Sequence, residues 1–275
     1  MPPAIPNDLY PHVHFNLAQR DIAAWFAGLA STERARVEEA AGEVVDIAER
    51  LALGGRNIVS DLFTPDTVFA EWQHYPPGDY YDRTTGAQAY YHSHDGNEEE
   101  HGHFHTFLRR KRTDGIFGLP ARAIALTPPI AADGGSPDAS QPDASQPNKA
   151  DDEVAHVVAI RMTHHGVPSH IFTVNRWVTG ETLFAAEDVI ASLNHYRFEG
   201  AARSDLGRWL EAMMMMFRPQ IEAALRRRDD VLTLYGAGLG EPGAAFEDRA
   251  LEVTSEVPIS ILGQLAAFGL LDETV

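Results

Sequence analysis

The spacing of apolar residues changes along this chain from a helical to an alternating pattern, and that change constrains the fold more than any other feature. Near the N-terminus, apolar residues recur every three or four positions. This predicts a helix after an N-cap box at Asn16 and a second helix that begins at Ser31 and ends at Gly54. From Tyr80 the pattern alternates, which is typical of strands. Four strands are predicted: Ala87–His94, Gly102–Arg109, Val154–Thr163 and Pro168–Trp177.

Helical spacing returns after the fourth strand. We expect a helix over Ala185–Tyr196 and a longer one after Ser204. The longer one keeps its apolar face through Pro219, either as a kinked helix or as two helices that meet at the proline. A short strand near Leu251–Val257 and a final helix from Ser260 complete the chain. This order predicts an α+β fold: an antiparallel sheet with two N-terminal helices before it and a long kinked C-terminal helix after it.

One segment between the second and third predicted strands has a composition that disfavours folding. Its sequence is AADGGSPDASQPDASQPNKADDE, with PDASQ repeated in tandem and no large apolar residue. Such a segment cannot bury enough apolar surface to offset the entropy of ordering. Residues 131–152 are therefore predicted to be a disordered insertion, and residues 1–15 a disordered N-terminal segment. Because isolated hairpins are only marginally stable, we expect residues 16–275 to form one domain around the insertion.

Composition excludes several classes of function. The net charge is −18, with 40 acidic against 22 basic residues, and such a surface repels phosphate backbones, so we expect no nucleic-acid partner. No apolar run approaches the roughly 20 residues that span a bilayer, and the N-terminus has no features of a secretory signal. We therefore expect no membrane partner and a cytoplasmic protein, of unknown oligomeric state. Without cysteine, any transition-metal site must use histidine, carboxylate and water.

Histidine is concentrated in one stretch, YYHSHDGNEEEHGHFHTFL, which holds five of the 13 histidines of the chain: His92, His94, His101, His103 and His105. Because strand side chains alternate between faces, positions 92 and 94 share a face, as do positions 101, 103 and 105. If the two strands pair with position 92 opposite 103 and position 90 opposite 105, all five lie on one face. Tyr91 and Phe104 then lie on the other face, where they would pack under a helix.

This arrangement predicts a site for one divalent transition-metal ion, Zn, Fe or Mn. We expect His92, His94 and His103 to bind it, with His101 or Glu100 completing the shell. His105 would support a ligand or belong to a second site. The alternative is a polar, solvent-facing sheet with incidental histidines. Whether the chain is an enzyme stays open, because a metal-dependent hydrolase or oxygenase and a non-catalytic metal-binding or sensing module both fit the pattern.

Two further groups of residues are candidates for catalysis or substrate binding. Glu71 and His74 precede a turn, where they would act as a general base or outer ligand, or else anchor the loop. Glu100 is the third candidate for a catalytic role. The second group lies at a strand end, where arginine would bind the carboxylate or phosphate of a small-molecule substrate, or pack on the tryptophan. It consists of Asn175, Arg176 and Trp177.

Short motifs in the histidine stretch resemble those of two known families. Residues 86–98, with the pattern G-x5-HSH-x3-E, are similar to the first motif of cupin metal barrels. The second cupin motif is missing, and the helical flanks differ from a pure β-barrel. Residues 101–107, HGHFHTF, resemble the histidine-triad motif of nucleotide hydrolases and transferases, which implies attack on phosphorus by His103. Glycine and threonine replace two hydrophobic positions of that motif.

A broader resemblance covers most of the chain. It rests on six blocks of sequence: EWQHYPPGDYYD, YYHSH, EHGHFHTFLR, FTVNRWVTGETLFAAEDVI, FRPQIEAALRRRD and DRALEVTS. The blocks lie between Glu71 and Ser255, and together they resemble an uncharacterised bacterial family defined as a domain of unknown function. The resemblance implies one continuous domain and contributes no mechanism.

Overall fold

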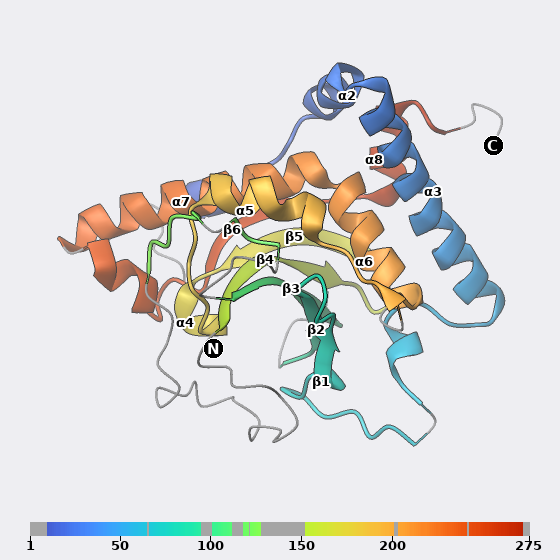
Figure 1. Ribbon diagram of the computed structural model, residues 1–275, viewed down its shortest axis with the longest axis horizontal. Helices are drawn as coiled ribbons and strands as arrows, with labels where there is room; N and C mark the ends of the chain where they lie inside the picture. The colour runs from blue at the N-terminus through green and yellow to red at the C-terminus, as the bar shows by residue number, and fades with distance from the viewer. Residues whose placement is uncertain are drawn as a thin grey trace.

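The computed structural model describes residues 10–64, 66–94, 101–111, 118–120, 122–127, 152–200, 203–240 and 242–271. Its strands form one six-stranded sheet, in which each strand pairs antiparallel with the next one along the chain (Figure 1). In pairing order the strands are β1 (Tyr75–Tyr81), β2 (Ala87–His92), β3 (Gly102–Lys111), β4 (Asp152–Met162), β5 (Pro168–Val174) and β6 (Val253–Pro258).

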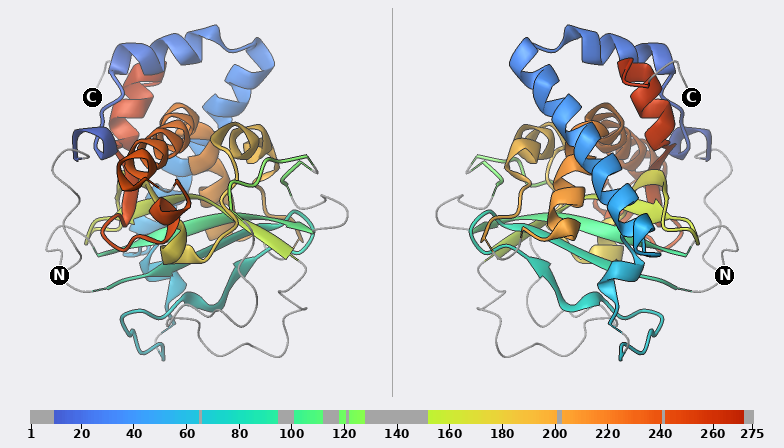
Figure 2. Two further views of the ribbon diagram at one scale, coloured as in Figure 1. Left: turned by 90° about the vertical axis from the view of Figure 1, so that its left-hand side faces the viewer. Right: turned by 90° about the vertical axis from the view of Figure 1, so that its right-hand side faces the viewer.

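Helices come before β1 and after β5, and the long ones gather over one face of the sheet. They are α1 (Tyr10–Val13), α2 (Gln19–Gly28), α3 (Ser31–Leu53), α4 (Arg176–Thr179), α5 (Ala186–Ser192), α6 (Asp205–Met216), α7 (Arg218–Leu239) and α8 (Ile261–Phe268), with short 3-10 segments η1 (Ser60–Leu62), η3 (Leu193–His195) and η5 (Pro242–Glu247). In Figures 1 and 2, α5, α6 and α7 lie over the sheet, while α3 packs against α6 and α2 against α8. The predicted α+β class is confirmed. None of the described helices is long and apolar enough to cross a membrane.

The core lies between the sheet and these helices. Tyr91 of β2 and Phe104 of β3 are fully buried, and the ring centroid of Phe104 lies 5.6 Å from that of Trp209 on α6. Ala89 belongs to the same apolar cluster. Burying an aromatic side chain of this kind contributes about 1.5–3 kcal/mol. Because alternate residues point to opposite faces, packing of this set against the helices leaves the histidines of β2 and β3 on the other face.

The pairing of β2 with β3 has the predicted register. His92 lies opposite His103, and Tyr90 lies opposite His105. A slip of one residue would have moved either the histidines or the apolar set to the wrong face. The register is therefore fixed by the need to bury Tyr91 and Phe104 under the helices.

The edge strand β1 was not among the predicted strands. Its sequence, YPPGDYY, contains two prolines, which cannot donate to a ladder and are confined to edges and irregular positions of sheets. Accordingly, β1 pairs only with β2, and its register shifts between Tyr75 and Tyr80.

The C-terminal helices begin and divide as their sequence predicts. The Gly207 N–H donates to the Ser204 hydroxyl, at 3.5 Å, so Ser204 caps α6. The helices α6 and α7 are separate and meet at Phe217, which is the second of the two predicted arrangements. Pro219 is tolerated because it lies in the first turn of α7, where backbone N–H groups have no partner within the helix.

The N-terminal segment departs from its prediction. Disorder is expected over residues 1–15, but Val13 is fully buried and His14 forms a β-bridge with Glu256. The Phe15 N–H also donates to the Glu256 carbonyl, at 3.0 Å. The prediction is therefore wrong for residues 10–15, and residues 1–9 lie outside the described residues.

The start of α2 also differs from the predicted N-cap box. The N-cap is Ala18 rather than Asn16, and no side chain caps it. The bridge to β6 keeps the chain extended as far as Phe15, so the helix begins later, at Gln19.

The connection between β3 and β4 contains the predicted insertion, residues 131–152. This stretch lies outside the described residues except for Asp152, which is the first residue of β4. Asp152 pairs with Lys111, so the two ends of the connection lie side by side on neighbouring strands. Residues 118–120 and 122–127 of the connection contact the rest of the fold: Arg110 donates to the Pro120 carbonyl, at 2.9 Å, and the Leu126 N–H donates to the Leu183 carbonyl, at 2.7 Å.

Candidate functional site

Three of the predicted histidines meet on the sheet face opposite the helices. His92 is the last residue of β2, and His103 and His105 lie on β3. One ring nitrogen from each forms a set in which all atoms lie within 4.8 Å of one another. In particular, Nε2 of His92 and Nε2 of His103 are 2.8 Å apart. All three side chains are buried. These three rings therefore present converging nitrogen atoms away from solvent.

A fourth histidine, His156 of β4, joins this group through an irregularity in the sheet. His105 lies opposite Ala159, yet Phe107 lies opposite His156, so β4 has one extra residue between these pairs. Such a β-bulge reverses the alternation of the strand and turns His156 onto the histidine face. Its Nε2 lies 3.0 Å from Nδ1 of His105. Sequence reasoning missed His156 because regular alternation places it on the opposite face.

The Thr106 side chain closes the bulge. Its hydroxyl donates to the Val158 carbonyl, at 2.5 Å, and the Val158 N–H lies 3.2 Å from the same oxygen. The bulge removes the N–H and the carbonyl of Val158 from the hydrogen bonds between the strands. The buried Thr106 hydroxyl bonds both of them instead.

The environment keeps these histidines uncharged. Burial, followed by repulsion from His103 and other neighbouring histidines, lowers the pKa of His92 to about 2. Burial, with Arg228 as the next cause, lowers the pKa of His156 to about 3. Burial also holds the pKa of His105 well below its usual value. Neutral imidazole is the form that binds metal ions, so burial favours the ligating state of His92, His105 and His156.

Two other predicted ligands lie differently. His94 is half-buried and stacks on Trp72, with ring centroids 4.6 Å apart, and its ring lies 5.2 Å from that of His103. His101 lies outside the cluster: its Nδ1 contacts the Tyr91 hydroxyl, and burial lowers its pKa. His94 therefore borders the three converging rings, whereas His101 faces the core side of β2.

Gly102 explains the position of His101. Its φ is +157°, and a Cβ placed there would lie 2.4 Å from the His92 carbonyl oxygen and 2.6 Å from the Tyr91 hydroxyl. The Tyr91 hydroxyl therefore approaches the strand at a residue that has no side chain, and it contacts Nδ1 of the preceding residue, His101. His101 lies directly before β3, so the alternation that places His103 and His105 together does not extend to it.

A second polar group lies beside the cluster on β1. Nδ1 of His74 lies 2.9 Å from Oδ1 of Asp79, and the other oxygen of Asp79 accepts a hydrogen bond from the Gln88 side-chain amide. The Gln88 oxygen accepts from Nε of Arg109, at 2.6 Å. The His74 ring stacks on Tyr90, with centroids 3.6 Å apart and planes 7° apart. Four side chains from three strands thus form one continuous hydrogen-bonded line.

The carboxylates predicted to act with His74 are not in this line. Glu71 is exposed to solvent, and Glu100 lies outside the described residues. Asp79, which sequence reasoning did not select, contacts His74 instead. Its backbone adopts φ +64°, a left-handed conformation that a non-glycine residue rarely takes.

The predicted substrate-binding group has internal partners. The Asn175 amide donates to the Ala245 and Leu251 carbonyls, at 2.7 Å and 3.0 Å. Arg176 pairs with Glu247 at 2.8 Å, and the Trp177 ring N–H donates to the Leu251 carbonyl at 3.0 Å. Arg249, rather than Arg176, lies over the Trp177 ring. These contacts tie α4 to η5 and to the chain before β6. They account for the three residues as structural anchors.

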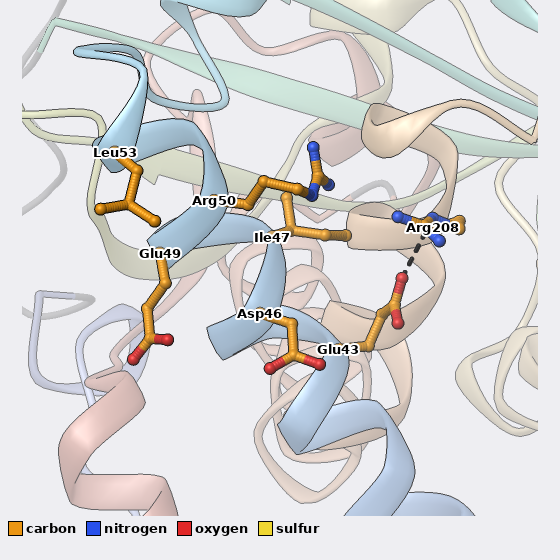
Figure 3. A pocket seen from close by; sticks show the side chains of 7 residues that line it. All are labelled: Glu43, Asp46, Ile47, Glu49, Arg50, Leu53 and Arg208. Atoms are coloured by element: carbon orange, nitrogen blue, oxygen red, sulfur yellow. Dashed lines mark ion pairs between the residues drawn. The ribbon is translucent and has the colours of Figure 1, made fainter.

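A groove between α3 and α6 is a separate feature (Figure 3). Glu43 and Arg208 form an ion pair across it, at 3.0 Å, and Arg50 pairs with Asp205 at 2.7 Å. The groove lies in the helical layer, on the other side of the sheet from the histidines. Its charged side chains link two helices and do not join the histidine cluster.

Comparison with known proteins gives one match. The family model described as "Domain of unknown function (DUF6969)" matches residues 38–259. No curated protein and no solved structure matches the chain. The match covers the whole sheet, all four clustered histidines and the His74–Asp79 pair.

Proposed function

Because the chain belongs to DUF6969, a family of unknown function, its residues must carry the functional assignment, and we propose that His92, His103 and His105 bind one divalent transition-metal ion. The observation that supports this proposal is the convergence of three ring nitrogens within 4.8 Å in a buried cluster. The expectation of an uncharacterised domain family is confirmed by the match, which contributes no chemistry of its own.

The protonation of the cluster favours a cation over a network of hydrogen bonds alone. A neutral imidazole has one N–H and one lone pair, so only one of two facing nitrogens can donate. Nε2 of His92 and Nε2 of His103 face each other at 2.8 Å. Nδ1 of His105 is engaged with His156, which leaves Nε2 of His105 as its nitrogen for an ion. A cation attracts the lone pairs of all three rings at once, whereas a proton can be shared by only two.

The dimensions of the cluster suit a metal ion after small movements of the rings. Zinc binds imidazole nitrogen at about 2.0–2.1 Å, so two ligand nitrogens of a tetrahedral site lie about 3.3 Å apart. The observed separations, 2.8 Å for one pair and at most 4.8 Å for the others, bracket this value. A fourth position is left for His94 or for a ligand from solution. Of the three ions expected, the nitrogen ligands favour zinc or iron over manganese.

Three histidines leave the fourth coordination position of the metal ion to another ligand. The occupant of that position decides between the two functions that the site supports. A zinc ion with an open position activates water for hydrolysis, and an iron ion with open positions activates oxygen. We propose a metal-dependent hydrolase or oxygenase, and a non-catalytic metal-binding or sensing module as the alternative if His94 closes the shell. Relaxation of solvent protons by Mn²⁺-loaded protein distinguishes them, because only an ion with an exchangeable water relaxes the bulk solvent strongly.

Metal content and thermal stability test the proposal. Protein purified without a His-tag should contain about one zinc or iron ion per chain by elemental analysis. Because the ligands converge only in the folded chain, zinc at about one hundred times its Kd should raise the free energy of unfolding by about 2.7 kcal/mol, and EDTA should remove that gain.

Matched histidine variants locate the ion. His103→Ala and His92→Ala should abolish stoichiometric binding. His165→Ala, at an exposed position, and His164→Ala should retain it. The proposal is rejected if the wild-type protein contains no metal and its melting temperature stays unchanged in excess zinc, iron(II) and manganese.

A further inference from the structure

The line of side chains that ends at His74 is built to hold one ring in one orientation. It begins at Arg109 on β3, passes through Gln88 on β2 and Asp79 on β1, and ends at His74, directly before β1. Both oxygens of the Asp79 carboxylate are occupied, one by His74 and one by Gln88. The carboxylate therefore cannot rotate away from the imidazole without losing two hydrogen bonds.

This contact determines which nitrogen of His74 carries the proton. A carboxylate only accepts hydrogen bonds, so the neutral ring must place its N–H at Nδ1, which faces Asp79 at 2.9 Å. Its lone pair then lies on Nε2. In peptides the neutral ring favours the opposite tautomer, with the proton on Nε2. Asp79 thus selects a less common state of His74 and leaves a basic nitrogen at the end of the ring away from the carboxylate.

His74 also differs from the neighbouring histidines in its access to solvent. Its side chain is 28 % exposed, whereas His92, His103 and His105 are buried. Its ring centroid lies 5.8 Å from that of His92, and stacking on Tyr90 fixes its plane. The His74 side chain is therefore partly open to a small molecule that approaches the cluster from solution.

The backbone around His74 is held in unusual conformations. Trp72 and Asp79 both have left-handed φ values, +66° and +64°. Non-glycine residues in this region are disfavoured and tend to mark functional sites. Trp72 stacks on His94, and Asp79 is hydrogen-bonded to His74. Both unusual conformations therefore place a side chain at the border of the histidine cluster.

From this geometry we propose that His74 is a general base, with Asp79 as its positioning residue, for a small molecule bearing an O–H group. Nε2 takes the proton and forms an N–H bond, the O–H bond breaks, and its electron pair stays on the oxygen. The imidazolium charge that results is balanced by the Asp79 carboxylate. The inference does not depend on the proposed ion, because the line from Arg109 to His74 contains none of the proposed ligands.

The tautomer of His74 is the direct test. Protein labelled with 15N-histidine is treated with EDTA and examined at about pH 8, and His74→Gln identifies the signal. We expect His74 as the Nδ1–H tautomer in the wild type. Asp79→Gly, which suits a left-handed φ while removing the carboxylate, should convert it to the Nε2–H tautomer. Asp66→Asn, an exposed carboxylate in the preceding loop, is the matched control and should change nothing.

Acylation by diethyl pyrocarbonate gives a second readout, because the reagent attacks an unprotonated ring nitrogen. Mass spectrometry should show faster modification of His74 than of the exposed His165, and Asp79→Gly should slow it by about tenfold, as expected for loss of a charge-assisted hydrogen bond. An Nε2–H tautomer in the wild type, a doubly protonated ring at this pH, or a rate insensitive to Asp79→Gly would overturn the proposal. Since these measurements use metal-free protein, they can fail while the metal proposal stands, and the reverse also holds.

Discussion

Buried titratable side chains of this protein shift their pKa values in opposite directions. Burial raises the pKa of Glu181 to about 8, although the backbone N–H of His156 donates to its Oε2 at 2.6 Å. Burial lowers the pKa of His92 to about 2 and that of His156 to about 3. The folded chain thus keeps a proton on Glu181 that the unfolded chain releases above its ordinary pKa of 4.5. It also excludes protons from these histidines that the unfolded chain takes up below 6.5.

We therefore expect the metal-free protein to be most stable near about pH 6.5–7. Between the folded and unfolded pKa values, each buried histidine lowers the free energy of unfolding by about 1.4 kcal/mol per pH unit as the pH falls, because the unfolded chain binds more protons. Glu181 acts in the opposite sense: the folded chain holds its proton, so stability falls as the pH rises toward about 8. Below pH 6.5 the histidines outnumber Glu181, and the net effect of acid is a loss of stability.

Urea unfolding in EDTA, from about pH 5 to about pH 8, measures both effects. Glu181→Gln keeps an oxygen that accepts from the backbone N–H of His156, and its side chain carries no charge. It should abolish the decline above neutral pH and steepen the decline toward acid, because Glu181 opposes the histidines between its unfolded and folded pKa values. A wild-type stability that is constant between about pH 5 and about pH 7 would show that these histidines are solvated in the folded protein.

At the scale of single elements, the bulge in β4 connects stability to the site. Thr106→Val removes the hydroxyl that bonds both backbone groups of Val158, and leaves them buried without a partner. We expect it to lower the free energy of unfolding by about 1–3 kcal/mol and to weaken zinc binding, because His156 would no longer be held against His105. Thr106→Ser retains the hydroxyl and should retain both properties.

Urea unfolding and zinc titration calorimetry on the two variants separate the contributions. If Thr106→Val lost stability but bound zinc as tightly as Thr106→Ser, the bulge would support the sheet without positioning the histidines.

The elements that sequence reasoning predicted share a local signal. Alternation in β2 and β3 predicts their faces and their register, and helical spacing predicts α3, α6 and α7. The residues that it missed or misplaced depend on contacts between distant parts of the chain. His156 reaches the site through a bulge that a Thr106 hydroxyl closes from the next strand. His101 lies directly before β3 and contacts the Tyr91 hydroxyl, for which Gly102 leaves room. Neither contact has a period that could be read along the chain.

The site on β1 could not be predicted for a different reason. A strand with two prolines has no clear strand pattern, and the contact between His74 and Asp79 depends on a left-handed backbone at a residue that is not glycine. The Glu71 that sequence reasoning paired with His74 is exposed. Spacing alone therefore selected His74 but not Asp79, the carboxylate that contacts it.

For the molecule as a whole, the connection between β3 and β4 divides into a part that contacts the fold and a part identified only by its composition. We expect deletion of residues 131–150, replaced by a short Gly-Ser linker, to leave the melting temperature unchanged, because Lys111 and Asp152 already pair across the two strands. Residues 118–127 must be kept, since Leu126 and Pro120 bond to the domain. Deletion of residues 118–127 as well is the comparison and should lower the melting temperature.

The melting temperatures of the two deletion proteins, measured by calorimetry, test this prediction. A large loss of melting temperature on removal of residues 131–150 alone would show that this stretch contributes to the folded domain, and that the one-domain interpretation with a dispensable insertion is wrong.

Each strand of the sheet pairs with its neighbour in sequence, so the speed of folding is governed by the lengths of the connections between them. Closing a loop costs more entropy the longer it is. The connections within β1–β2–β3 and β4–β5 are short, whereas β6 begins at Val253, far along the chain from the end of β5 at Val174. Short-range contacts form fast and long-range contacts form slowly. The hairpin that carries His92, His103 and His105 is therefore expected among the earliest structures of a nascent chain, with the docking of β6 last, so an ion present during synthesis would meet its ligands before the sheet is complete.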